Sequence, residues 1–260
     1  MSNTSVRTVL TKVFAACCVF VLTAAATAQG FDSYTKQIID YGVEKDFPEN
    51  PHHDQLTCFY YRDLMVKQLT NQWIKGSLFL SFLRFDKARP ACVKEHSSDE
   101  KVLGNSEWRG YFRGLVKGDL VFFDSDDGRD GGMPFAVYDS KTQKKIFEDN
   151  AYSVWMWNPK LRPPPSPFNN IRVRTTYDGN VVLTYLRVLG TECDIPNKGA
   201  ECWPPLVQKL GLKTAAPSCV RWEKNQTAGA SAVAYPVETS LFPTPVTKTI
   251  SGPVRCWAAD

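Results

Sequence analysis

The sequence predicts a mainly β protein of antiparallel meander sheets, arranged as a sandwich or as propeller-like blades, with one short C-terminal helix and three disulfides. The prediction depends most on the stretch from Gly118 to Val188, where short runs of β-branched and aromatic residues alternate with tight polar turns. Runs of this kind are typical of strands joined by hairpins, so neighbours in sequence become neighbours in the sheet. No clear repeat of about 40 to 50 residues is present in the sequence, so the choice between sandwich and propeller stays open.

Two turns within this stretch have recognisable chemistry. Asp139 begins the first, because an aspartate side chain can accept hydrogen bonds from backbone amides two residues further on. The second, Asp178 to Asn180, has a glycine at its centre and is the clearest hairpin signal in the chain. We therefore expect one strand to end at Tyr138 and another to begin near Val181.

Further strands are predicted on either side of this stretch. The run Ser77–Phe85 is apolar on both faces, which is typical of a central strand in a sheet covered on both sides. Trp108–Leu115 is another predicted strand, whereas Asp63–Thr70 fits either a helix or a strand. Near the C-terminus we expect a strand at Ala232–Glu238, at the edge of its sheet because Pro236 has no amide hydrogen to donate.

The single predicted helix is Pro204–Gly211. Its prolines lie where a first helical turn tolerates them and its glycine lies where a helix usually ends, which gives about two turns. The polar residues 29–57 are predicted to form an extended N-terminal arm, with one helical turn at Ser33–Tyr41. Residues 58–260 are predicted to form a single, mostly β domain.

Residues 1–28 have the pattern of a secretory signal peptide. Arg7 and Lys12 give a positive start, an apolar run follows from Val13 to Ala26, and small residues precede a cleavage site near Ala28. The alternative is an uncleaved membrane anchor, but about 14 apolar residues are fewer than the roughly 20 that span a bilayer. We therefore expect a secreted or periplasmic protein with no stable membrane span after cleavage.

The net charge argues against a nucleic-acid partner. The formal charge is +4, and it falls to +2 when Arg7 and Lys12, the two basic residues of the leader, are removed, since the leader has no acidic residue. Such a near-balance provides no electrostatic attraction to a polyanion.

Six of the eight cysteines lie after the leader, and an even number in an exported chain is typical of disulfides. Six cysteines allow 15 pairings. Neighbouring pairs are preferred because they leave the order of the chain along the sheet undisturbed; they are Cys58–Cys92, Cys193–Cys202 and Cys219–Cys256. No Cys-x-x-Cys motif occurs after the leader, which disfavours a zinc or redox site.

The only cofactor that the sequence suggests is calcium. Asp124, Asp126 and Asp130 lie in a glycine-rich loop, and calcium prefers several carboxylate oxygens from one bent loop. The loop matches an EF-hand poorly, and the simpler interpretation is an acidic hairpin whose aspartates bond to their own backbone. His52 and Asp54 form a weaker candidate metal pair, for which a solvent-exposed loop is the simpler interpretation.

No sequence motif specifies a catalytic residue. The nucleophile, zinc-protease, phosphate-binding and dinucleotide-binding motifs are all missing. A secreted hydrolase that uses two carboxylates remains an alternative, with Asp119, Glu148 and Asp149 as candidates. Trp155 and Trp157 could stack on sugar rings, although apolar cover for the sheet is the simpler interpretation. The leading hypothesis is a non-catalytic exported module that binds a protein or carbohydrate ligand, and a calcium-stabilised structural domain is a further alternative.

Overall fold

The computed structural model describes residues 30–43, 53–71, 76–103, 110–125, 132–152, 170–220 and 229–259. These residues form two antiparallel sheets and one helix, so the predicted mainly β fold is confirmed. The first sheet is a five-stranded meander of consecutive strands. Its strands are β1 (Thr35–Val43), β2 (His53–Tyr60), β3 (Leu64–Asn71), β4 (Ser77–Arg84) and β5 (Lys101–Leu103).

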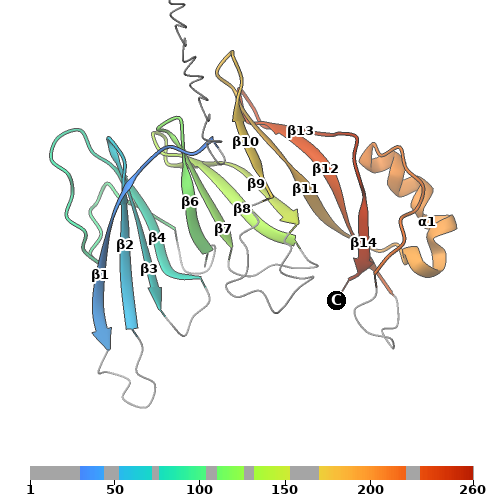
Figure 1. Ribbon diagram of the computed structural model, residues 1–260, viewed down its shortest axis with the longest axis horizontal. Coiled ribbons are helices and arrows are strands. Elements are labelled where there is room, and N and C mark those ends of the chain that lie inside the picture. The colour runs from blue at the N-terminus through green and yellow to red at the C-terminus, as the bar shows by residue number, and fades with distance from the viewer. Residues whose placement is uncertain are drawn as a thin grey trace, which may run out of the picture.

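The second sheet has nine strands, in the order β13-β12-β11-β9-β8-β7-β6, with β10 beside β11 and β14 beside β12. In Figure 1 the strands of both sheets succeed one another across the molecule, from β1 at one end to β14 and the helix at the other. The strands are β6 (Gly110–Val116), β7 (Leu120–Ser125), β8 (Gly132–Asp139), β9 (Lys144–Tyr152), β10 (Arg172–Thr175), β11 (Val181–Thr191), β12 (Ser231–Ser240), β13 (Val246–Thr249) and β14 (Arg255–Ala258).

The strands β6, β7 and β8 lie between two hydrophobic layers. On one side, Phe123 packs with Leu80 and Phe82 of β4 in one cluster. On the other side, Phe122 packs with residues of β11, β12 and the helix, including Tyr185, in a larger cluster. Because side chains alternate along a strand, β7 uses one set of aromatic residues for each layer. The five-stranded sheet therefore packs against one face of β6–β8, whereas the opposite face of these strands packs against β11, β12 and α1.

The strand β12 is in the interior of its sheet, so the predicted edge position was wrong. It pairs with β11 along its whole length, and on its other side Val237–Ser240 pairs with β13 and Ser231–Ala234 pairs with β14. Pro236 lies between these two short partners, where its carbonyl accepts a hydrogen bond from the amide of Ile250 at 3.0 Å. A proline is tolerated there because no neighbouring strand needs its missing amide hydrogen.

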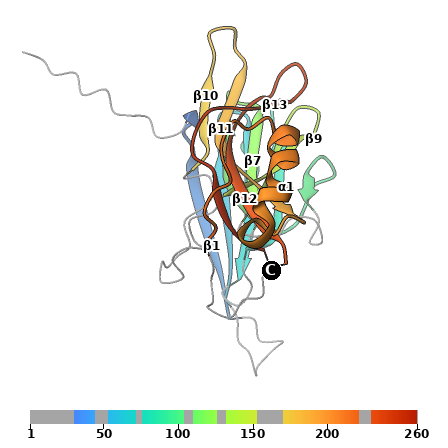
Figure 2. The same ribbon diagram turned by 90° about the vertical axis from the view of Figure 1, so that its right-hand side faces the viewer.

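The helix α1 spans Ile195–Leu210 and ends at Gly211, which has a left-handed conformation as its predicted C-cap role requires. Its predicted start at Pro204 was wrong by nine residues. The side chain of Asp194 caps the N-terminus by accepting a hydrogen bond from the amide of Asn197. The prolines therefore lie inside the helix. Figure 2 is viewed from the end of the molecule that carries α1, with β1 at the far end.

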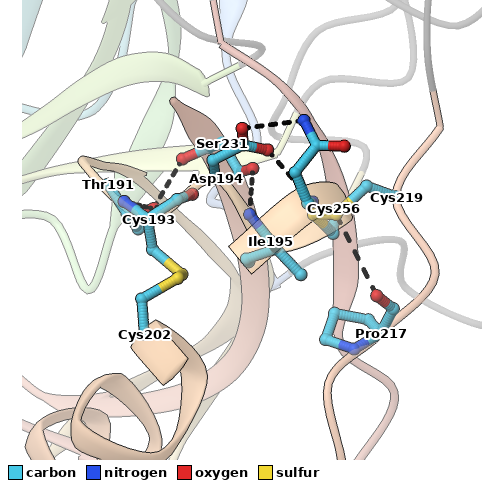
Figure 3. The surroundings of a disulfide bond; sticks show 10 residues. Thr191, Cys193, Asp194, Ile195, Cys202, Pro217, Cys219, Ser231 and Cys256 are labelled. Carbon is cyan, nitrogen blue, oxygen red and sulfur yellow. Dashed lines mark hydrogen bonds between the residues drawn. A yellow bond between two sulfur atoms is a disulfide. The ribbon is translucent and has the colours of Figure 1, made fainter. Parts of the chain in front are cut away.

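The three disulfides join the neighbouring pairs that the sequence favoured, with Cα–Cα distances of 5.9 Å for Cys58–Cys92, 5.5 Å for Cys193–Cys202 and 4.4 Å for Cys219–Cys256. Figure 3 shows that the last two lie near one another at the start of α1. There the hydroxyl of Ser231 accepts a hydrogen bond from the amide of Ile195, 3.2 Å away. This hydrogen bond attaches the first turn of α1 to β12. The disulfide Cys193–Cys202 attaches the helix to the chain directly before it.

The segment 29–57 contains β1 and the first residues of β2, which pair with each other in antiparallel register. The helical turn expected at Ser33–Tyr41 was therefore wrong, because this stretch gains backbone hydrogen bonds as an outer strand of the sheet. Asp63–Thr70, left open between helix and strand, falls mainly in β3. The proposed leader, residues 1–28, lies outside the described residues. No helix in the described part of the chain is long and apolar enough to cross a membrane.

Candidate functional site

Three adjoining hollows share the side chain of Lys117, in the turn between β6 and β7. Their volumes are about 480, 240 and 530 Å³. We call them together the Lys117 cleft. Its lining residues are Asp32, Ser33, Tyr61, Arg62, Asp63, Arg84, Leu115, Lys117, Gly118, Asp119, Leu120, Asp139, Lys141, Asp178, Gly179, Asn180, Phe242 and Pro243.

The position of the cleft follows from the meander topology. In an antiparallel meander every second turn lies at the same end of the sheet. The turns that follow β2, β6, β8, β10 and β12 all lie at this end, and each contributes to the lining. The two turns predicted at Asp139 and at Asp178–Asn180 therefore belong to one site. The sequence predicted both turns, but not that they meet.

The turn that holds Lys117 has a special backbone conformation. Lys117 and Gly118 both have positive φ angles, 56° and 72°. Two successive residues of this kind are typical of the tight turn that matches the twist of a β-hairpin. The ammonium group of Lys117 donates a hydrogen bond to the carbonyl of Gly179, in the turn between β10 and β11. The amide of Gly118 donates to the carboxylate of Asp32 at 2.6 Å, which attaches the N-terminal segment to the cleft.

Arg84 connects the two sheets inside the cleft. Its guanidinium donates to Asp119 at 3.0 Å and to the hydroxyl of Ser140 at 2.9 Å, both in the nine-stranded sheet's turns. It also donates to Asp63, in the turn between β2 and β3. The other carboxylate oxygen of Asp119 accepts a hydrogen bond from Lys141 at 2.7 Å. The charges on this wall are thus already paired with one another.

The charged side chains of the cleft nearly cancel. The lining contains four cationic side chains, Arg62, Arg84, Lys117 and Lys141, and five carboxylates, Asp32, Asp63, Asp119, Asp139 and Asp178. At the exposed carboxylate of Asp178, hydrogen bonds from Thr176 and the backbone of Asn180 lower the pKa, so this group is an anion at neutral pH.

Two aromatic rings line the cleft. Phe242 is 40% exposed, and it lines two of the three hollows. Its backbone is fixed by Asn180, whose side chain donates to the carbonyl of Phe242 at 2.9 Å and accepts from its amide at 3.1 Å. The second ring is that of Tyr61, whose pKa is raised by burial and further raised by the nearby Tyr34 and Asp32. Tyr61 is therefore a neutral phenol at any physiological pH.

The three candidate carboxylates of a hydrolase lie in different surroundings. Asp119 is part of the cleft, whereas Glu148 is at the surface in an ion pair with Lys145. Asp149 lies five residues into β9, roughly 17 Å from the start of that strand at the rise of extended chain. It accepts hydrogen bonds from the hydroxyl of Tyr185 and from Nε of Arg187, the latter at 2.9 Å. Asp119 and Asp149 therefore do not share the cleft.

Burial and the adjacent carboxylate of Asp149 raise the pKa of Tyr185. The phenol therefore stays protonated and acts as a hydrogen-bond donor in the core. Thr239 continues this buried chain, with its hydroxyl 3.3 Å from that of Tyr185. The whole group bridges β9, β11 and β12, which gives Asp149 a structural role.

Of the proposed calcium ligands, the described residues include Asp124 alone; Asp126 and Asp130 lie outside them. Asp124 is fully buried, and its Oδ2 atom lies 2.7 Å from Nε of Arg113. Among the described residues, no three histidine, cysteine, aspartate or glutamate side chains are grouped as a metal site would need. Calcium binding by this loop stays a prediction.

The other candidate binding residues are placed as follows. Asp54 is buried and accepts hydrogen bonds from Lys94 at 2.8 Å and from Asn71 at 3.1 Å, while His52 lies outside the described residues. Trp155 and Trp157 also lie outside them. A separate hollow of about 250 Å³ lies at the end of α1, with Lys213 as its one ionisable lining residue.

Comparisons of this chain with protein-family models, with curated proteins and with solved structures found no match. The function is therefore inferred from the geometry and chemistry of the cleft. Its two central residues, Lys117 and Phe242, were missed by the sequence analysis. The Lys-Gly step at 117–118, directly before a strand, was a usable turn signal, whereas nothing local marks Phe242 as a cleft residue.

Proposed function

We propose that this protein is an exported, disulfide-stabilised β module that binds a neutral polyhydroxyl ligand, of the oligosaccharide class, in the Lys117 cleft without transforming it. The observation that carries the proposal is the convergence of five turns on three adjoining hollows, with charged groups of both signs and an exposed ring at Phe242. A concave site with a few converging polar groups is the usual form of a small-molecule site.

The charge pattern favours a neutral ligand. A ligand of one strong sign would meet groups of its own sign, and it would compete with the ion pairs that Asp119 forms with Arg84 and Lys141. A sugar hydroxyl can donate to one group and accept from another without breaking these pairs. Each carboxylate has about four acceptor positions and each lysine has three donors, so paired residues keep capacity for a ligand.

The exposed ring supports the same ligand class. The face of a sugar ring carries C–H groups, which pack against an aromatic face and remove apolar surface from water. Phe242 lines two of the hollows, and it shares one of them with Asp178 and Lys117, whose side chains have the acceptors and donors that hydroxyl groups need.

Export is the second part of the proposal. Three disulfides indicate an oxidising, non-cytoplasmic compartment. Together with the leader pattern of residues 1–28, they support a periplasmic or secreted location. Expression of the full chain followed by intact-mass analysis tests this: the exported protein should begin at or near Gln29 and contain no free thiol. Recovery of the uncleaved chain in the cytoplasm, with reduced cysteines, would reject this part of the proposal.

Ligand binding is tested by titrating ¹⁵N-labelled protein with a panel of short neutral oligosaccharides. We expect at least one to shift the amide resonances of Lys117, Gly118 and Gly179. Phe242→Ala should weaken that binding about tenfold, which is the scale of one lost stacking contact of about 1.4 kcal/mol.

Lys117→Ala tests the lysine of the cleft. Its matched control is Lys213→Ala, which makes the same change in the separate hollow beside α1. Only the former should weaken binding. Shifts confined to residues outside the cleft, equal effects of the two lysine variants, or the absence of any shift at millimolar sugar would overturn the proposal. Release of shorter sugars during the titration would instead support the alternative of a secreted hydrolase.

A further inference from the structure

The strand β1 forms one end of the five-stranded sheet. It pairs with β2 on one side, and no strand among the described residues pairs with its other side. Figure 1 shows it as the outermost strand, at the end of the molecule opposite to α1. A nine-residue outer strand presents a row of backbone donors and acceptors to whatever lies beside it. The end strand on the opposite side of this sheet, β5, has three residues.

Three large apolar side chains in and directly before β1 are exposed. Tyr34, directly before the strand, is 48% exposed, and Ile38 and Tyr41 are 47% and 43% exposed. These three account for a third of the nine large exposed hydrophobic residues in the described part of the chain. Exposed apolar residues that gather along one outer strand are typical of an interaction surface.

The charges on β1 are arranged symmetrically about Ile38. Lys36 precedes it by two residues and Asp40 follows it by two, so all three side chains point to the same face. If a second strand of the same sequence lies antiparallel to β1 with Ile38 opposite Ile38, then Lys36 of each copy lies opposite Asp40 of the other. Opposite charges in directly facing positions stabilise an antiparallel pair.

We propose that β1 pairs with β1 of a second copy of this chain, antiparallel across a twofold axis at Ile38, so that the two five-stranded sheets become one continuous sheet. A twofold interface uses the same patch on both copies, and this patch is self-complementary in charge and in its central apolar residue. A parallel arrangement in register would instead place Lys36 beside Lys36.

Two details of the strand agree with this register. The pairing of β1 with β2 is regular from Thr35 to Asp40 and shifts only between Asp40 and Val43, so the five residues centred on Ile38 all lie in the regular part. The carboxylate of Asp40 is also held in place, since its Oδ1 atom accepts a hydrogen bond from the amide of Gly42 at 2.8 Å. The Oδ2 atom of this side chain has acceptor capacity for a lysine across the axis.

The first experiment is sedimentation equilibrium of the exported protein over a range of concentrations. We expect a monomer–dimer equilibrium. Lys36→Glu places two carboxylates opposite one another at each of two symmetry-related positions, so it should weaken dimerisation about tenfold or more. Asp40→Lys should do the same with two cations. The double variant K36E/D40K restores opposite charges and should recover dimerisation. If the single variants had weakened the dimer through misfolding or through loss of one contact, the double variant would not recover it.

The second experiment tests the register by cross-linking. Facing residues of an antiparallel pair have Cα atoms about 4.5 to 5.5 Å apart, which a disulfide can bridge. Ile38→Cys should therefore form a covalent dimer under oxidation. The matched control Lys36→Cys should not, because the two copies of residue 36 would lie about 13 Å apart along the strand. Circular dichroism confirms that each variant is folded.

The proposal is overturned by a protein that is monomeric at every concentration, or by a dimer that the single charge variants do not weaken. It is also overturned if K36E/D40K fails to recover the dimer while folded, or if Lys36→Cys cross-links as readily as Ile38→Cys. Capture of an unrelated peptide along β1 by a protein that stays monomeric would equally reject self-pairing.

Discussion

The ammonium group of Lys67 lies 2.9 Å from Oε2 of Glu100, and the two side chains are only 2% and 1% exposed. Lys67 also donates to the backbone carbonyls of Val93 and Glu95, at 3.2 and 2.7 Å. This pair joins β3 to the chain that runs from β4 to β5, close to where Cys92 is bonded to Cys58. The long connection is thus attached to the sheet by a disulfide and by a buried ion pair.

Removing one partner of this pair should be strongly destabilising. Lys67→Met leaves the Glu100 carboxylate buried without its cation, and we expect the free energy of unfolding to fall by about 3 to 5 kcal/mol. The double variant K67M/E100Q should be less destabilised than the sum of the single variants, because no buried charge remains. Urea denaturation at neutral pH measures both. A loss below about 1 kcal/mol for Lys67→Met would contradict the buried geometry.

The stability that this pair provides should depend on pH. Burial alone would raise the pKa of Glu100, but hydrogen bonds from Ser81, Lys67 and His96 outweigh it, and the pKa is lowered overall. A carboxyl group of this kind stabilises the fold fully above its unfolded pKa, about 4.3, and loses that contribution as the pH falls through its lower folded pKa.

Glu100→Gln removes the titrating group. The difference in unfolding free energy between the parent and Glu100→Gln should therefore be constant from neutral pH down to about pH 5 and should shrink at more acidic pH. The Nδ1 atom of His96 lies 2.9 Å from the same carboxylate, so His96→Gln provides the control for this second partner. A difference that grows on acidification would contradict the lowered pKa.

The disulfides should differ in their contribution according to the loop that each closes. Cys58–Cys92 spans 34 residues and Cys193–Cys202 spans 9. In the chain-entropy account these closures stabilise by about 3.8 and about 2.6 kcal/mol. Replacing both cysteines of a pair by alanine should therefore cost about 1 kcal/mol more for the former, as measured by thermal denaturation. An equal or reversed order would show that strain or packing outweighs the entropy term.

Asp124 provides a test of the calcium hypothesis, because its carboxylate forms an ion pair with Arg113. Asp124→Asn leaves a partly buried guanidinium without its anion, and we expect a loss of about 2 to 3 kcal/mol in stability. The loss should be the same in EDTA and in millimolar calcium. If calcium raises the melting temperature of the parent and Asp124→Asn abolishes that rise, the loop is a calcium site and the ion pair is secondary.

Several features were predictable because the signals are local. The hairpin at Asp178–Asn180 depends on three adjacent residues, and the helix end at Gly211 depends on one residue without a Cβ atom. The pairing of the cysteines followed from their spacing, since neighbours in a meander stay close. The helical turn predicted within Ser33–Tyr41 and the edge position predicted from Pro236 were wrong, because both depend on which strand lies alongside.

The sequence by itself therefore determined the strands of the central meander, their turns and the C-terminal end of α1, all of which depend on residues close together in the chain, and the order of the cysteines favoured the pairs that are joined. Only the tertiary structure decided that Lys117 and Phe242 belong to one cleft, that Lys67 meets Glu100, and that β1 lies at the end of its sheet. The physical reason is that each of these relationships joins residues far apart in sequence, and no local propensity encodes which distant side chain will be the neighbour.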